Sequence, residues 1–162
     1  MRLTEGVEWG LHCGVVLAVL PSGAALSTAR LAEYHAVPEA YLAKHLQAMS
    51  RAGILEAGTG RGGGYRLARP PADVSVLDVV EAVDGGDPAF RCLEIRRRGP
   101  AALPAREYRT MCGIHRVMVE ADEAWRAQLA RTSIADLAAG VARDASPEAI
   151  AKFGTWLQEV IA

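Results

Sequence analysis

The stretch YLAKHLQAMSRAGILEAGTGRGGGYRLAR, residues 41–69, decides the fold that the sequence predicts. Its first part has apolar residues at helical spacing, so that Leu42, Leu46 and Met49 share one face of a helix. Two short apolar segments then flank a glycine-rich tip, which is the pattern of a two-stranded β-wing. Another short helix precedes this stretch across a tight turn. The pattern predicts a winged helix-turn-helix.

Capping and turn residues give the expected boundaries of the helices around this stretch. Thr4 is placed to cap a helix over residues 4–20. Ser27 or Thr28 can cap a second helix, and Pro38 can open a third that stops at Gly53. The first helix also carries a ridge of small residues, beside which another backbone could approach closely: Gly6, Gly10 and Gly14.

The second half of the chain predicts more helix around one long irregular stretch. We expect a helix over residues 76–83, an irregular stretch over 88–111, a long helix from Cys112 and a last helix over 146–161. The predicted fold class is mainly α with a small β-wing (α+β), a winged helix-turn-helix followed by a long helix in the C-terminal part. The expected divisions are a winged helix-turn-helix DNA-binding domain at 1–84, a loop at 85–111, and the long helix and the C-terminal helix at 112–162.

Composition places the chain among globular proteins. It has 162 residues, of which 51% are hydrophobic and 23% charged, and its formal net charge is −1. Without an apolar run long enough to span a membrane or a signal peptide, we expect a cytoplasmic protein with no membrane partner. The near-neutral charge means that any DNA contact depends on locally placed charge. Three cysteines indicate metal binding or thiol chemistry rather than disulfides.

The outer face of the helix before the wing has the side chains that a major groove requires. Amide and ammonium groups can contact base edges, methyl groups can contact thymine, and arginine can contact phosphate. An ordinary amphipathic helix with a solvated outer face would have the same pattern, but the wing favours DNA binding, because an arginine on a glycine-rich tip can enter a minor groove. The predicted DNA-binding residues are Thr28, Ala40, Tyr41, Lys44, Gln47, Arg51 and Arg61.

Four segments together resemble the IscR/NsrR family of bacterial winged-helix iron–sulfur regulators. They are residues 41–69, VSVLDVVEAVDGG (74–86), MRLT (1–4) and RCLE (91–94). The resemblance covers about residues 1–135. It implies a homodimer joined by the long C-terminal dimerisation helix within 112–162, a palindromic DNA operator, and an iron–sulfur cluster in a cluster-binding loop at 85–111 that controls DNA binding. One departure concerns operator preference: the family commonly has arginine before Gly60, where this chain has Thr59, and its arginine is displaced to Arg61.

The irregular stretch resembles the cluster loop of that family, with one cysteine missing. Cys92 matches the first of the three family cysteines, Cys112 matches the last, and His115 matches a histidine that some members have. No cysteine stands among the 19 residues between Cys92 and Cys112. A cluster normally takes four protein ligands, so two must come from elsewhere.

The first helix offers candidates for the missing ligands. The position of Glu8 matches an acidic residue that, in some family members, ligates the cluster of the partner subunit. His12 lies one turn further on the same side, whereas Cys13 is turned about 100° from His12 and is less able to join it. The favoured ligand set is Glu8, His12, Cys92 and Cys112 on a [2Fe–2S] cluster. The alternatives are His115 as third ligand with Glu8 as fourth, and a [4Fe–4S] cluster.

These residues predict a regulator whose operator affinity depends on the redox state of the cluster, with Trp9 as a possible switch beside the ligands. One alternative is a cluster-free or mononuclear zinc or iron sensor. Another is an enzyme with Cys112 as nucleophile and His115 as base, although the sequence offers no orienting acid, and we expect no small-molecule substrate. The arginine run 96–98 could touch DNA, or it could keep a long loop soluble.

Overall fold

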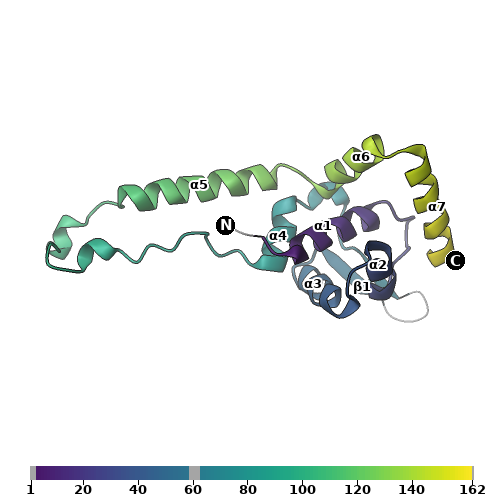
Figure 1. Cartoon of the computed structure of the whole chain (residues 1–162), viewed down its shortest axis with the longest axis horizontal. Coiled ribbons are helices and arrows are strands. Elements are labelled where there is room, and N and C mark those ends of the chain that lie inside the picture. The colour runs from purple at the N-terminus through teal and green to yellow at the C-terminus, as the bar shows by residue number, and fades with distance from the viewer. Residues whose placement is uncertain (1–2, 59–62, 162) are drawn as a thin grey trace. The chain divides into compact units, whose positions relative to one another are not determined.

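The structure is a computed structural model that describes residues 3–58 and 63–161 (Figure 1). Nine helices and strands follow one another along these residues: α1 (Glu5–Ala18), α2 (Thr28–His35), α3 (Glu39–Arg51), β1 (Leu55–Gly58), β2 (Gly64–Leu67), α4 (Val76–Asp84), α5 (Gly113–Ala130), α6 (Ile134–Asp144) and α7 (Pro147–Ile161). Three single-turn 3₁₀ helices lie at Pro71–Asp73, Ile95–Arg97 and Ala105–Glu107. The predicted fold class is confirmed.

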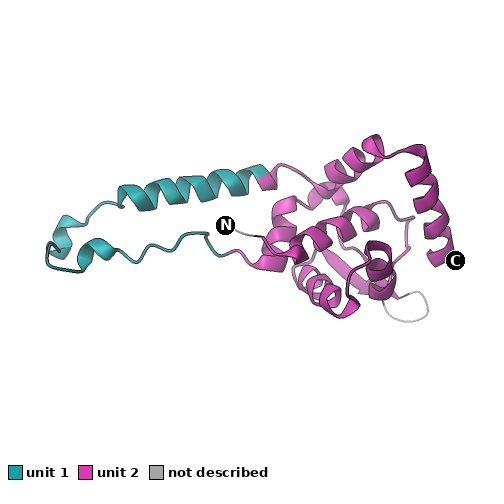
Figure 2. Ribbon diagram, viewed as in Figure 1, with its two compact units in different colours: residues 1, 87–128 teal, residues 2–86, 129–162 magenta. Residues whose placement is uncertain are grey.

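The chain forms two compact units, which Figure 2 shows in different colours. Asp87–Gln128 make up one unit, and the remaining described residues, up to Gly86 and from Leu129, make up the other. We call them the loop unit and the DNA-binding unit. The three-part division of the sequence, at 84 and 111, remains a prediction. None of the helices in the described ranges is both long enough and apolar enough to cross a membrane.

Helix α1 lies at the centre of the DNA-binding unit, and its glycine ridge faces the core. Gly6, Gly10 and Gly14 are buried. A Cβ on Gly10 would lie 3.2 Å from the sulfur of Met49, and one on Gly14 would lie 3.1 Å from Ile134. The elements that approach the ridge therefore do so through side chains of α3, α4 and α6, rather than through a backbone as the sequence suggested.

The helix-turn-helix follows the predicted caps. The Ser27 hydroxyl accepts from the Arg30 N–H at 3.2 Å and starts α2, and Pro38 is the N-cap of α3. Leu42, Leu46 and Met49 are fully buried, as their spacing predicted. The α3 helix therefore packs its apolar face on the core and leaves its opposite face exposed.

The wing is an antiparallel pair joined to the start of the helix-turn-helix. Leu55 pairs with Leu67 and Gly58 with Gly64. Strand β2 also pairs with Leu26, because Tyr65 and Leu26 exchange backbone hydrogen bonds at 2.8 and 3.0 Å. A Cβ on Gly64 would lie 2.5 Å from the Leu26 carbonyl oxygen, so this close approach requires glycine.

The chain after α5 returns to the DNA-binding unit through a helix that the sequence did not predict. Ser133 and Asp136 form a capping box that starts α6. The Ile134 N–H donates to the Val74 carbonyl at 2.8 Å, and its side chain is fully buried. The sequence predicts no helix between Leu129 and residue 146, because the apolar pattern that begins at Cys112 is a stronger signal than this local cap.

Thr4 occupies the predicted N-cap of α1, but its side chain does not cap the helix. Its hydroxyl and its backbone N–H donate instead to the carboxylate of Asp84, the N–H at 2.9 Å. The first turn of α1 is thus tied to the last residue of α4.

We expect Gly64→Ala to destabilise the DNA-binding unit, because the added methyl group overlaps the Leu26 backbone. The free energy of unfolding should fall by about 1–3 kcal/mol, the usual cost of overpacking, as measured by urea denaturation. Gly58→Ala is the matched control on the paired strand, since its Cβ would meet nothing closer than 3.8 Å. Equal losses in both variants would show that the approach to Leu26 is not the constraint.

Candidate functional site

The outer face of α3 carries the side chains predicted to contact DNA. Ala40, Tyr41, Lys44, Gln47 and Arg51 are all exposed, on the side of α3 opposite its buried leucines. The Lys44 ammonium lies 5.2 Å from the centre of the Tyr41 ring, a cation–π contact that orients the lysine.

Two further predicted DNA contacts lie elsewhere. Thr28 is the first residue of α2 and is half-buried. Arg61, with Thr59, lies outside the described residues, so its predicted role at the wing tip remains a prediction.

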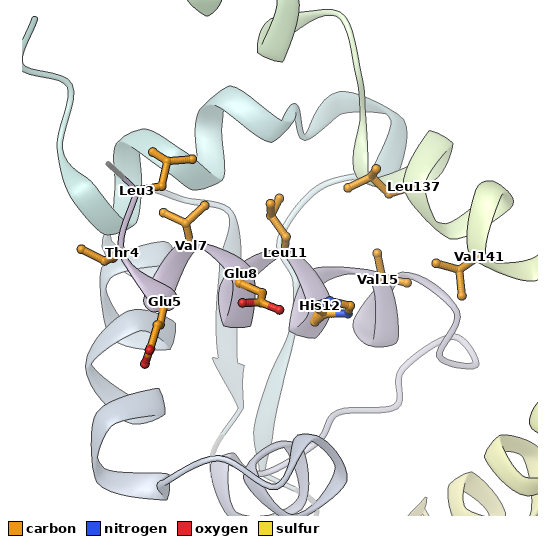
Figure 3. A pocket seen from close by; sticks show the side chains of 10 residues that line it. All are labelled: Leu3, Thr4, Glu5, Val7, Glu8, Leu11, His12, Val15, Leu137 and Val141. Carbon is orange, nitrogen blue, oxygen red and sulfur yellow. The ribbon is translucent and has the colours of Figure 1, made fainter. Parts of the chain in front are cut away.

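Glu8 and His12 lie one turn apart on the exposed side of α1, as their spacing predicted. Figure 3 shows the two side chains next to each other along the helix. Both line a groove of about 530 Å³. The rest of the groove is largely apolar and comes from α1, the residues before it and α6: Leu3, Thr4, Glu5, Val7, Leu11, Val15, Leu137 and Val141. An acid–imidazole pair therefore borders an open apolar surface.

Trp9 connects this helix to α3. Its indole meets the His45 ring edge-on, with ring centres 5.9 Å apart. Gly6 leaves room for the same ring, since a Cβ there would lie 2.6 Å from His45 Nδ1. His45 belongs to α3, so the residue between the two candidate ligands touches the helix that carries the DNA-facing side chains. Sequence reasoning missed His45, because nothing local marks a contact with a residue 36 positions away.

His35 is a second residue that sequence reasoning missed. Its ring centre lies 5.6 Å from that of His12 and 4.8 Å from that of Tyr34. Its Nε2 is buried, and no polar atom of the described residues forms a hydrogen bond with it. Burial lowers the pKa of His35, and the nearby charge of His12 lowers it further. The neutral form is therefore favoured, with a free ring nitrogen in the neighbourhood of His12.

Cys92, Cys112 and His115 all lie in the loop unit. They line one cavity of about 440 Å³, together with four apolar and three charged residues: Phe90, Leu93, Ile95, Ile114, Arg91, Glu94 and Arg96. The sequence predicted that Cys92 and Cys112 act together, and their common cavity is consistent with this.

Backbone N–H groups donate to both sulfur atoms of this cavity. The N–H groups of His115 and Ile114, at the start of α5, lower the pKa of the Cys112 thiol, and the charge of Arg96 lowers it further. The Glu94 N–H donates to Cys92 Sγ at 3.4 Å. The site thus favours the thiolate form of Cys112, which is the form that binds metal.

Cys13 is unlike the other two cysteines. Its side chain is fully buried, and burial raises the pKa of its thiol to about 12. Within the described ranges, no group of three or more histidine, cysteine and acidic side chains lies together closely enough to hold a metal ion. The two candidate donor pairs are each incomplete, and they belong to different units of the chain.

Comparison with known proteins identifies the family. A family model named Rrf2 and described as an iron-dependent transcriptional regulator matches residues 3–140. The chain belongs to the Rrf2 family. An HTH-type transcriptional regulator of Mycobacterium tuberculosis, Rv1287, is 28% identical over 155 residues, which are 94% of this chain and 88% of that protein. The Bacillus subtilis HTH-type regulator YwgB is 28% identical over 126 residues, 77% of this chain and 76% of that protein.

Solved structures of Rrf2 proteins share the fold. T. potens IscR aligns with a TM-score of 0.66 at 19% identity, over 91% of this chain and 95% of that one. CymR, the global cysteine regulator of B. subtilis, aligns with a TM-score of 0.67 at 19% identity, over 86% of this chain and 97% of that one. The resemblance found in the sequence is confirmed. The Rrf2 family and these relatives regulate transcription rather than catalyse reactions, and this chain is an Rrf2-family transcriptional regulator.

We expect Lys44→Ala to weaken DNA binding by this Rrf2 regulator, because it removes a cation from the exposed face of α3. The loss should be about 1–3 kcal/mol, or about 5- to 150-fold, if the ammonium contacts a base. Affinity can be measured by fluorescence anisotropy on a duplex selected from random DNA by the wild-type protein. Lys152→Ala is the control, since Lys152 is the other lysine of the chain and lies on α7, paired with Glu148. Equal affinities of the two variants would contradict the assignment of α3.

Proposed function

We propose that this Rrf2 regulator binds a [2Fe–2S] cluster between two copies of the chain, and that the redox state of the cluster sets its affinity for a palindromic operator. Cys92 and Cys112 of one copy and Glu8 and His12 of the other would be the ligands. The observation that carries this proposal is that two incomplete donor pairs are displayed by one chain, two thiols in the loop unit and a carboxylate and an imidazole on α1.

The thiol pair fits a cluster in its chemistry. Apolar and charged side chains line the cavity together, and N–H groups directed at the sulfur atoms stabilise thiolate ligands and tune the potential of a bound cluster. The lowered pKa of Cys112, caused by the His115 and Ile114 N–H groups and by Arg96, acts in the same direction. Two thiolates satisfy half of the four ligand positions.

The pair on α1 fits the other half. Glu8 and His12 are exposed, so a second copy of the chain can reach them. A metal-ligating histidine usually donates its second ring N–H to an acceptor, which fixes its orientation. His35 is the candidate acceptor, because its ring centre lies 5.6 Å from that of His12 and its Nε2 has no hydrogen-bond partner among the described residues. Histidine in place of cysteine on one iron of a two-iron cluster is established chemistry.

Helix α5 supports the requirement for a second copy. It is an 18-residue helix without a buried residue among those described. Its apolar residues Ile114 and Val117 are 70% and 62% exposed, and Met118 lies on the same stripe. An apolar stripe of this kind is stable in water when another surface covers it. A homodimer through α5 provides that surface.

The chain offers a physical connection between the ligands and the DNA-facing helix. When bound, the cluster supplies a one-electron couple whose charge changes beside Glu8 and His12. Trp9 lies between these residues on α1 and contacts His45 of α3. A shift of α1 or of the indole therefore changes the packing of α3, and in a dimer it changes the relation of two α3 helices to the two halves of an operator.

Cluster content in cysteine variants tests the loop ligands. We expect Cys92→Ser and Cys112→Ser to lose iron and acid-labile sulfide, because each loses a thiolate. Cys13→Ala should retain both, since Cys13 is buried and its thiol stays protonated. Iron and sulfide are assayed in protein purified without oxygen. Iron without sulfide in the wild type would instead indicate a mononuclear site, and full cluster content in either serine variant would contradict the ligand assignment.

Operator affinity and visible spectra test the remaining ligands and the switch. We expect oxidised and dithionite-reduced protein to differ in affinity by about 5- to 150-fold, the usual range of allosteric coupling. Glu8→Ala and His12→Ala should change the visible spectrum, whereas His115→Ala should not. Equal affinities at verified cluster content would refute the redox switch, and a spectrum altered only by His115→Ala would replace the ligands on α1.

A further inference from the structure

The arginine run 96–98 lies inside the loop that separates the two candidate thiolate ligands, and its first member lines the cavity. Arg96 lines the same cavity as Cys92 and Cys112. Its guanidinium donates two hydrogen bonds to the Glu94 carboxylate, from Nε to Oε1 and from Nη2 to Oε2, the second at 2.9 Å. This bidentate contact restricts the orientation of the guanidinium more than a single hydrogen bond would.

Tyr108 contacts both the side chain and the backbone of the same arginine. Its ring centre lies 5.2 Å from Arg96 Cζ, a cation–π contact. Its hydroxyl donates to the Arg96 carbonyl at 2.7 Å and accepts the Leu103 N–H at 2.7 Å. Both the backbone and the side chain of Arg96 are therefore held, and the loop is folded around Tyr108.

Glu94 joins this arrangement to the thiols. Its backbone N–H donates to Cys92 Sγ, and its side chain holds Arg96. One residue thus contacts a candidate cluster ligand with its main chain and positions a cation in the same cavity with its side chain. Arg98 differs: among the described residues its side chain has no hydrogen bond, ion pair or ring contact, and it does not line this cavity.

We propose that Arg96 raises the reduction potential of the cluster, because its guanidinium lies beside the Cys92 and Cys112 ligands and offsets the Glu94 carboxylate in the same cavity, where Glu94 and Tyr108 hold it in place. This inference rests on the proposed function. Reduction adds one negative charge to the site, whichever side chains complete the ligand set. A nearby cation stabilises the reduced state more than the oxidised state and so raises the potential. Arginine suits this role because it remains charged at all relevant pH values.

The test compares the midpoint potential of the intact dimer in wild type, Arg96→Gln and Arg98→Gln, by spectroelectrochemical titration. Both substitutions remove one charge from the same run, so the control isolates position from net charge. We expect Arg96→Gln to lower the reduced-to-oxidised ratio at a fixed potential by about tenfold, which is about 59 mV for a one-electron couple. Arg98→Gln should change it by less than about threefold, because that charge is solvated.

Arg96→Lys separates charge from the shape of the loop. Lysine keeps the charge but loses the bidentate contact with Glu94. We therefore expect Arg96→Lys to recover at least half of the reduction potential that Arg96→Gln loses. Equal potentials for Arg96→Gln and Arg98→Gln would overturn the inference, and so would equal potentials for Arg96→Gln and Arg96→Lys, because the second result assigns the effect to loop order. Iron and sulfide assays separate these results from failure of the proposed function. If the wild-type protein holds no cluster, both the proposed function and this inference are wrong.

Discussion

The close packing of α1 through its three glycines is the constraint on which the other features of the DNA-binding unit depend. At Gly6, Gly10 and Gly14, the absence of a Cβ lets side chains from α3, α4 and α6 reach the backbone of α1. Protein interiors are packed as densely as crystals, so a displacement of one element is passed to its neighbours. A helix that displays candidate ligands on one side and contacts three helices on the other can therefore convert a change at its surface into a change of packing.

Much of the helix-turn-helix could be predicted because its signals are local. The apolar spacing of Leu42, Leu46 and Met49 and the cap at Ser27 depend on residues within a turn or two of each other. Pro38 and Gly53 end segments by their own backbone preferences. The outer face of α3 followed directly, since a helix with one face on the core exposes the other.

The features that were missed depend on contacts between distant residues or on a signal that was outweighed. The capping box at Ser133 is a local signal, but the apolar pattern that begins at Cys112 is stronger and predicts one long helix. The contacts of His45 with Trp9 and of His35 with His12 join different helices, and a single sequence carries no sign of them. Thr4 is the N-cap residue, as predicted, but its hydroxyl donates to the Asp84 carboxylate and does not cap the helix.

The division of the donor pairs between two units of the chain has a thermodynamic consequence. In the proposed arrangement a single copy offers only two ligands to a cluster, so binding of the metal and association of the copies are linked, and each stabilises the other by the same free energy. Cluster content then depends on protein concentration as well as on iron supply. Dilution acts on such a regulator in the same direction as a chelator, and the amount of protein in the cell becomes part of what the regulator senses.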